Sequence, residues 1–238
     1  MTIFGPLLLK DARVEQLAGT WANGATGNES IGYTQTGLIL TTKKAIFGFG
    51  RTASNVSITN LVSNTGVVGN DVTGVGTARY GLAAAGYGTD KAIFGFGYVA
   101  VIGNVSLTNL VSNTGVVGND VTGVGTARRE PSAAGYGLDK AIFGYGLTGG
   151  YPGTSMTNLV SNTGVVSTDV TGVGTPRLDV AAAGYGTDKA IFGFGSTNAN
   201  VYVSMTNLVS NTGVVGTDVT GVGTARSVLA AAGFSFSR

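Results

Sequence analysis

Short runs of apolar and β-branched residues, separated by glycine, asparagine and aspartate, recur along the chain. One such stretch passes through residues 81–87, 91–96 and 105–111 and ends in a Val/Thr/Gly-rich segment that closes at Arg128. Short runs of this kind, bounded by turn-forming residues, are typical of β-strands. Glycine at every few positions would weaken any helix. The pattern therefore predicts an all-β chain with four strands in each such stretch.

This stretch is one copy of a tandem repeat. The string Thr-Asn-Leu-Val-Ser-Asn-Thr-Gly-Val-Val begins at Thr59, Thr108, Thr157 and Thr206, so that each copy starts 49 residues after the one before. Five units of this length fit into 238 residues. Four strands in a unit of this length are typical of a propeller blade, whereas the coils of a β-solenoid are shorter. The sequence therefore predicts a single domain, a five-bladed β-propeller with four antiparallel strands in each blade.

The two ends of the chain supply complementary parts of one unit. The Ala-Ala-Ala-Gly segment at 230–233 is followed by five residues to the C-terminus, and after Met1 the chain reads Thr-Ile-Phe-Gly. An internal unit has the same spacing, with Ala-Ala-Ala-Gly at 83–86, five residues, and Ala-Ile-Phe-Gly at 92–95. We expect the C-terminal strand to be the innermost strand of the N-terminal blade, which closes the ring and leaves no open sheet edge. The expected blades comprise residues 1–32 with 227–238, 33–79, 80–128, 129–177 and 178–226.

The least regular part of the chain precedes the first clear copy. Residues 33–44 have the length of the inner-strand segment of the other units but lack its alanines, and we expect an inner strand there too. The single tryptophan, Trp21, also lies in this region, and we expect it to pack in the core beside the closure.

Two recurring features of the unit allow a structural and a functional interpretation. In the structural interpretation, the small residues of the inner segment allow the inner strands to pack closely near the ring axis. In the functional interpretation, they line a ligand channel. The arginines that end each unit hold neighbouring blades together, or they attract an anion. We favour the structural interpretation of both. These arginines are Arg79, Arg128, Arg177 and Arg226.

The recurring aspartates fall at predicted turns. The Asp-Lys pairs are expected to be exposed turns of little net energy, and the aspartates after Val-Val are expected to cap turns. The first set is Asp90, Asp139 and Asp188, and the second is Asp71, Asp120, Asp169 and Asp218. Both 113–115 and 118–120 have turn-forming sequences, so the turn between the third and fourth strands has two candidate positions.

The order of these segments resembles the kelch repeat. An arginine, a small apolar strand, a short turn and a Lys-Ala-Ile-Phe-Gly strand with the glycine pair Gly95 and Gly97 match the family's pattern over nearly the whole chain. The tryptophan of the kelch fourth strand is missing from the four clear copies. The resemblance implies a kelch-like propeller. Near-identical tandem units also resemble repetitive proteins of phages and environmental sequences, and they are equally typical of repeat engineering.

The amino-acid composition argues against several kinds of functional site and partner. The chain has no cysteine and no histidine, which removes disulfides, thiolate metal sites and any catalytic pair built on either residue. A net charge of +2, dispersed along the chain, argues against nucleic acid and anionic membranes as partners. No basic start with a long apolar run marks a signal peptide, and no run approaches the ~18 apolar residues of a spanning helix. We expect no metal, no cofactor, no catalytic residue and no enzymatic activity, and localisation stays open.

Differences between the copies concentrate in two places. One follows the Lys-Ala-Ile-Phe-Gly strand and the other follows the arginine, and in a four-stranded meander both open on the same face. The varied segments carry tyrosine among Asn, Ser, Thr and Gly, a composition that suits adaptable recognition. The predicted ligand-binding residues are Arg51, Tyr80, Tyr98, Arg129, Glu130, Tyr151, Asp179, Asn198 and Tyr202.

Three functions are compatible with this pattern. The first is a monomeric, non-enzymatic recognition module for a protein or a surface glycan, since aromatic and amide side chains suit sugars. The second is a structural or engineered repeat scaffold without a ligand, which the near-identity of the units favours. The third, an enzyme on a propeller, is disfavoured by the scarcity of catalytic side chains. The fold alone does not choose among them.

Overall fold

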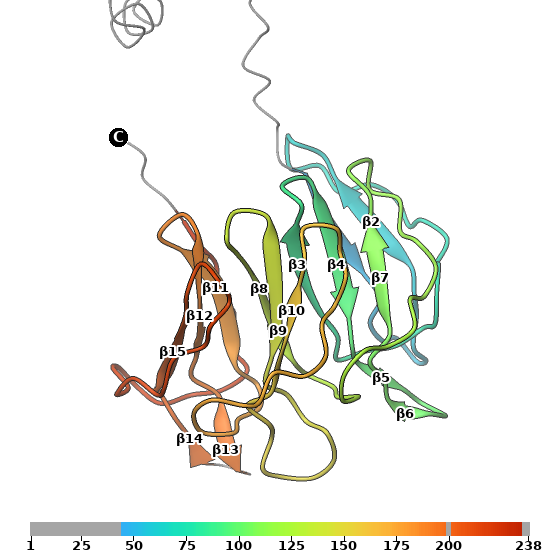
Figure 1. Cartoon of the computed structure of the whole chain (residues 1–238). Helices are drawn as coiled ribbons and strands as arrows, with labels where there is room; N and C mark the ends of the chain where they lie inside the picture. The colour runs from blue at the N-terminus through green and yellow to red at the C-terminus, as the bar shows by residue number, and fades with distance from the viewer. Residues whose placement is uncertain (1–43, 199–200, 235–238) are drawn as a thin grey trace, which may run out of the picture. The chain divides into compact units, whose positions relative to one another are not determined.

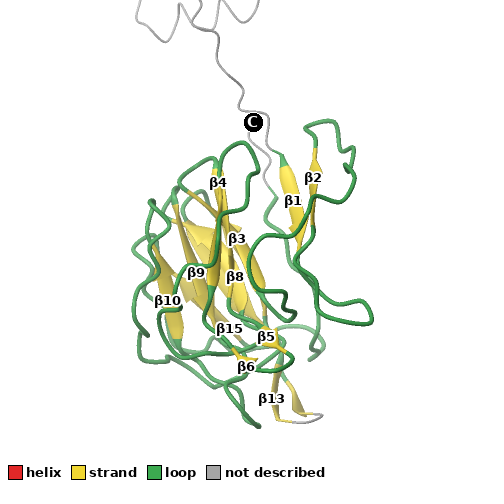
Figure 2. Ribbon diagram, turned by 90° about the vertical axis from the view of Figure 1, so that its right-hand side faces the viewer, coloured by secondary structure: helices red, strands yellow, loops and turns green. Residues whose placement is uncertain are grey.

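A computed structural model describes residues 44–198 and 201–234 (Figure 1). They belong to one compact unit, residues 43–238, and the other unit, residues 1–42, lies outside the described residues. Outside the described residues also lie residues 33–43 of the inner strand expected at 33–44, Trp21, and the N-terminal partner of the closing strand. The described part is all-β and has no helix, as predicted (Figure 2).

Four sheets repeat along the described chain, and two small hairpins accompany them. The sheet strands are β1 (Ala45–Gly48) and β2 (Thr59–Val62); β3 (Ala83–Tyr87), β4 (Lys91–Gly95) and β7 (Thr108–Val111); β8 (Ser132–Tyr136), β9 (Lys140–Gly144) and β10 (Thr157–Val160); β11 (Ala181–Tyr185), β12 (Lys189–Gly193) and β15 (Thr206–Val209). The hairpins are β5 (Tyr98–Val99) with β6 (Gly103–Asn104) and β13 (Ser196–Asn198) with β14 (Val201–Tyr202).

Each complete sheet is an antiparallel meander whose central strand is the Lys-Ala-Ile-Phe-Gly segment. In one unit β4 pairs with β3 on one side and with β7 on the other, without a register shift. The same registers recur in the next two units. The first three predicted strands of the unit are thus confirmed, and in the β1–β2 unit the third partner would fall outside the described residues.

The predicted fourth strand is reduced to a segment that pairs at two points. Val117 bridges to Val111 and Val121 bridges to Thr108, so the outer segment has one more residue between its bridges than its partner strand has. The extra residue is a β-bulge, which interrupts a regular ladder. The turn itself lies at 113–115, where the N–H of Ser112 donates to the carbonyl of Val116 at 2.9 Å. The second candidate position, 118–120, is the bulge.

Consecutive sheets pack side by side through their inner strands. β3 packs against β8, and β8 packs against β11 (Figure 1). A Cβ placed on Gly135 would lie 3.4 Å from the carbonyl oxygen of Gly86, and one on Gly184 would lie 3.3 Å from that of Gly135. Because these strands approach so closely, small residues are required there, as the structural interpretation of the inner segment expected.

Aromatic rings fill the space between neighbouring sheets. A Cβ on Gly144 would lie 2.7 Å from Cζ of Phe192, and one on Gly95 would lie 2.6 Å from Cζ of Phe143. The ring of Phe143 packs edge-to-face on Phe96 at a centroid distance of 5.2 Å. Gly48, Gly95 and Gly144, at the ends of three Phe-Gly strands, thus each receive an aromatic ring from the next unit, which couples the units.

Candidate binding face

The connections that differ between units gather at one end of the sheets. The segment after each of Arg79, Arg128 and Arg177 bridges to the segment after the central strand, as in Tyr80 with Tyr98 and Leu178 with Ser196. The β5–β6 and β13–β14 hairpins lie at this same end in both views (Figures 1 and 2). We call this surface the varied-loop face; it comprises residues 51–58, 80–82, 98–107, 129–131, 147–156, 178–180 and 196–205 where described.

The constant turns lie at the other end of the strands. The N–H of Gly88 donates to the carbonyl of Asp139 in the next unit at 2.6 Å. Each turn aspartate pairs with the lysine that follows it, at 2.9, 2.8 and 3.2 Å in the three units, and these pairs are largely exposed. Pairs on the surface usually contribute little to stability, so the small energy expected of them stays a prediction.

Four predicted residues form a contiguous stack across three units, which we call the arginine–tyrosine strip. The guanidinium of Arg51 lies 5.4 Å from the ring centroid of Tyr80, and the rings of Tyr80 and Tyr98 are 5.4 Å apart. The guanidinium of Arg129 lies 5.6 Å from the ring of Tyr98. Backbone bonds of 2.8 and 3.2 Å between the two tyrosines hold the middle of the strip. Stacked arginines of this kind are held in position while their N–H groups remain able to bind carboxylates.

Two predicted carboxylates lie beside one end of the strip. Oε1 of Glu130 is 3.6 Å from Nε of Arg129. Burial and the nearby charge of Asp179 raise the pKa of Glu130, and burial raises the pKa of Asp179. Both residues have positive φ angles, 55° and 53°, a conformation that costs a non-glycine residue free energy. These two carboxylates come from consecutive units, and their charges interact.

The remaining predicted residues stand apart from the strip. Tyr151 is 53% exposed and Tyr202 is 49% exposed, and within the described residues neither ring contacts another aromatic ring. Asn198 ends β13, where its backbone pairs with Val201. These three residues share the varied-loop face with the strip without joining it.

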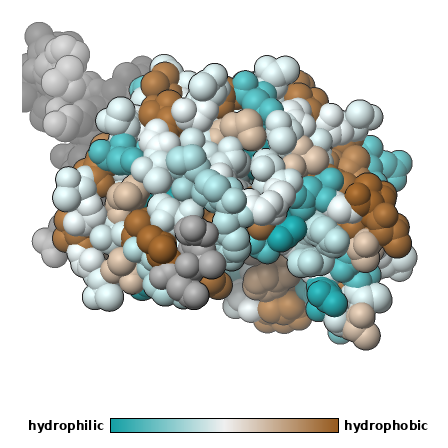
Figure 3. All heavy atoms as spheres, turned by 90° about the horizontal axis from the view of Figure 1, so that it is seen from below, coloured by the Kyte–Doolittle hydropathy of each residue, from teal (hydrophilic) through white to brown (hydrophobic). Residues whose placement is uncertain are grey.

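The sequence prediction missed the apolar tip of the β5–β6 hairpin. Val101 and Ile102 at this tip are 92% and 68% exposed. Apolar atoms lie in separate patches on this face, with polar surface between them (Figure 3). Isolated exposed apolar residues are common and do not by themselves indicate a binding site. Val101 and Ile102 are of interest because they lie in the same hairpin as Tyr98.

Three of the four recurring arginines are buried and join neighbouring units. Arg79 and Arg128 are fully buried, and each donates to an asparagine of the next unit at 2.7 Å, Asn109 and Asn158 respectively. Arg177 donates to Asn207 in the same way. Each lies over an aromatic ring, with Arg128 4.0 Å from the ring centroid of Phe96. Burial lowers the pKa of Arg79 and of Arg128 to about 10, so both stay charged at neutral pH.

Three of the four aspartates after Val-Val join this network instead of only capping turns. Oδ2 of Asp120 accepts hydrogen bonds from the N–H and Oγ1 of Thr77, one unit earlier, at 2.9 and 2.6 Å. Burial pushes the pKa of Asp120 upward, but hydrogen bonds from Thr77 and Asn109 outweigh burial and hold it below its ordinary value. Asp169 and Asp218 make the equivalent bonds and have lowered pKa values for the same reasons. Arg, Asn, Asp and Thr thus form an inter-unit clip.

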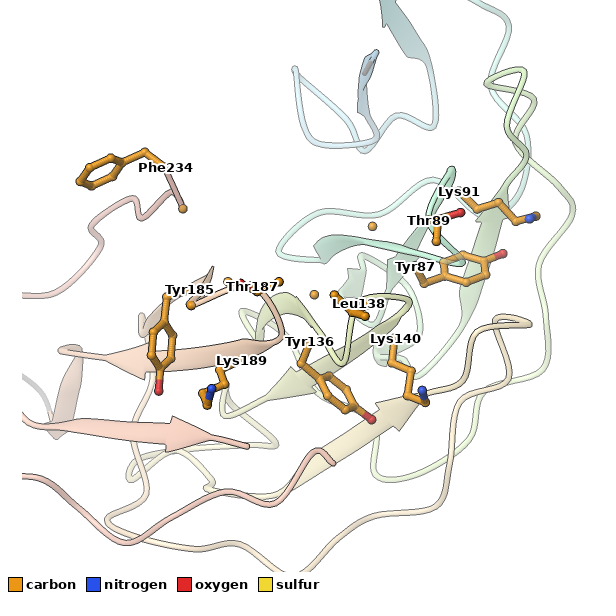
Figure 4. Close-up of a pocket in the computed structure, with 15 residues that line it drawn as sticks. Tyr87, Thr89, Lys91, Tyr136, Leu138, Lys140, Tyr185, Thr187, Lys189 and Phe234 are labelled. Carbon is orange, nitrogen blue, oxygen red and sulfur yellow. The ribbon is translucent and has the colours of Figure 1, made fainter. Parts of the chain in front are cut away.

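A hollow of about 460 Å³ lies at the inner strands on the constant-turn side (Figure 4). Three Tyr-Lys pairs from consecutive units line it, together with glycine backbone. Burial raises the pKa of Tyr87 and of Tyr136, and both tyrosine side chains are buried between units. The Tyr-Lys pairs of this lining repeat with the unit, although Leu138 takes the place of Thr89 and Thr187 in the middle one.

The described residues hold no group of three or more His, Cys, Asp or Glu side chains placed to bind a metal ion. They also contain no helix with the length and apolar character that crossing a membrane requires. A scan against protein-family models finds no match for the chain, and a search of curated proteins finds no significant similarity.

Proposed function

We propose that the chain is a kelch-like, five-bladed β-propeller that acts as a non-enzymatic recognition module through its varied-loop face. The row of inner strands β3, β8 and β11 supports the ring, because each packs on the next in the same way. The C-terminal segment continues this row, since Gly233 lies against the carbonyl of Gly184. That is the position of an inner strand of one more blade, whose remaining strands would come from the N-terminus.

The last arginine supports the same arrangement. Arg226 lies 4.3 Å from the ring of Phe194 and donates to the carbonyl of Thr224 at 3.0 Å, as Arg79 and Arg128 do with the threonine of their own units. Within the described residues it has no asparagine partner of a following unit. In the proposed ring, the N-terminal residues occupy that side of Arg226.

The proposed binding function rests on one observation: the sequence differences between units lie at one end of the sheets. Both sets of varied segments gather at one end of the sheets, while the turns at the other end keep their sequence and their Asp-Lys pairs. Neutral drift would change exposed connections at both ends of the sheets. The ligand is a protein or a surface glycan, and the chain acts as a monomer.

The test is a loop exchange. Residues 147–156 are replaced by residues 98–107 of the preceding unit, which have the same length and flanks. Ligands of the unaltered protein are first found by screening glycan and protein arrays, with Tyr98, Tyr151 and Tyr202 changed together to alanine as a second variant. Binding should fall in both variants while the melting temperature stays within a few degrees. Intact binding together with a large loss of stability would contradict the proposal.

A ligand-free scaffold is the second candidate. The near-identity of the units and their identical inter-unit clips favour it, because both are features of stability and neither depends on a ligand. On this reading the arrays yield no ligand that depends on the varied loops.

A further inference from the structure

The two ends of the arginine–tyrosine strip differ in charge. Arg51 is exposed, and no carboxylate among the described residues forms an ion pair with it. At the other end Arg129 is paired with Glu130, and the charge of Asp179 acts on Glu130 and raises its pKa. Among the described residues, the first end therefore carries an unpaired positive charge, whereas the second combines an arginine with two carboxylates whose charges interact.

The middle of the strip is aromatic and adjoins apolar surface. Tyr98 begins the hairpin whose tip holds the exposed Val101 and Ile102. One face of each tyrosine ring is taken by a guanidinium, and the two rings cover each other at an angle of 53°. Few ring faces are left for stacking a sugar, whereas an apolar side chain can contact the ring edges and the valine–isoleucine tip.

We propose that the strip binds an extended protein segment with an acidic side chain opposite Arg51, an apolar side chain beside Tyr98, Val101 and Ile102, and a basic side chain opposite Glu130 and Asp179. This inference rests on the proposed recognition function of the varied-loop face. The opposite charges at the two ends fix the direction of the segment, as complementary charges do at interfaces. Common acidic glycans supply the anion but not the cation, so the charge order selects a protein.

The dimensions suit a short segment. The three steps of the strip, 5.4, 5.4 and 5.6 Å, span about 16 Å when laid end to end. An extended chain rises about 3.3 Å per residue, so about five residues cover the strip. The acidic and basic side chains should therefore lie about four residues apart in the partner.

The experiment is a selection of random linear peptides displayed on phage against the full chain. Enriched peptides should carry an acidic and a basic residue in one fixed order at that spacing, with an apolar residue between them. Arg51→Gln should weaken their binding about tenfold or more, because a charge-assisted contact is lost. Arg51→Lys, which keeps the charge, should retain more binding than Arg51→Gln. Lys189→Gln, which removes one positive charge from the constant-turn side, should leave binding unchanged.

Two results overturn the inference. One is a set of selected peptides without the ordered charges, and the other is equal weakening by Arg51→Gln and Lys189→Gln. A glycan or protein ligand that is lost on exchanging 147–156 but unaffected by Arg51→Gln overturns this inference alone and leaves the proposed function standing. If no ligand of any kind depends on the varied loops, the proposed function fails as well.

Discussion

Replacing Asp120 by Asn should weaken the contact between two units without changing the size of the side chain. The carboxylate accepts two hydrogen bonds from Thr77 on Oδ2 and one from Nδ2 of Asn109 on Oδ1, the last at 2.9 Å. It also lies 3.8 Å from Nη1 of the buried Arg79. An asparagine amide accepts on one side only, so its NH₂ group would face a donor on the other.

The magnitude follows from these contacts. Loss of a hydrogen bond to a charged group costs about 1.5–3 kcal/mol, and removing one partner of a fully buried ion pair costs about 3–5 kcal/mol. The Asp120 side chain is 25% exposed and its ion pair is long, at 3.8 Å, which places it at the lower end of the second range. We expect a loss of about 3 kcal/mol in the free energy of unfolding. For a chain of this size that is a fall of about 6–12 °C in Tm.

Urea unfolding followed by circular dichroism, with calorimetry for Tm, measures the effect. The matched control is Asp71→Asn, at the same position of the preceding unit. Asp71 accepts a hydrogen bond from Asn60 at 2.8 Å, and among the described residues no threonine or arginine of an earlier unit binds it. The control should lose less than about 1 kcal/mol. Equal losses in the two variants would refute the inter-unit clip as a source of stability.

Three further predictions concern packing, pH and chemistry. Gly144→Ala should cost about 1–3 kcal/mol because its Cβ would meet the ring of Phe192, whereas Gly149→Ala, whose Cβ would have no described heavy atom within 4 Å, should cost less; equal costs would contradict the packing. The lowered pKa of Asp120 and its counterparts stabilises the fold above their ordinary pKa and is lost as pH falls through the folded value. Urea midpoints should therefore drop below about pH 4, less so in Asp120→Asn, and a parallel drop in both proteins would argue against the linkage. Elemental analysis after dialysis should find no stoichiometric transition metal, and a broad hydrolase screen should find no activity; either finding would contradict a non-enzymatic module.

The strand order within a unit could be predicted because the segments that pair are neighbours in the sequence. Small residues, a turn and the Lys-Ala-Ile-Phe-Gly segment follow one another in sequence and pair in that order, as in β3 and β4. The choice between turns at 113–115 and 118–120 was not predictable, since a bulge and a turn use the same residue types. The β5–β6 hairpin was missed because it lies in a segment that differs between units, so no repeat reinforces its pattern.

The candidate site was predictable in its position but not in its contacts. The comparison of units places Tyr80 and Tyr98 at one end of the strands, whereas their stacking with Arg51 and Arg129 depends on how three units pack. Asp120 was read as a turn cap because its partner Thr77 lies in the preceding unit. The sequence did contain evidence for the inter-unit clip, because the Thr, Arg, Asn and Asp that form it are present in every clear copy.

The most direct test of the proposed ring is a disulfide across its closure. The β3–β4 register pairs Ala84 with Phe94, and the matching residues at the chain ends are Ala231 and Phe4. The chain has no cysteine of its own, so Ala231→Cys with Phe4→Cys introduces a single pair. Mild oxidation should give an intramolecular disulfide in the monomer, identified by mass spectrometry of its peptides. The shifted pair, Ala231→Cys with Ile3→Cys, should form far less, because a shift of one residue points the side chain to the other face. Absence of the intramolecular disulfide, or equal formation in the two pairs, would contradict the closed five-bladed ring.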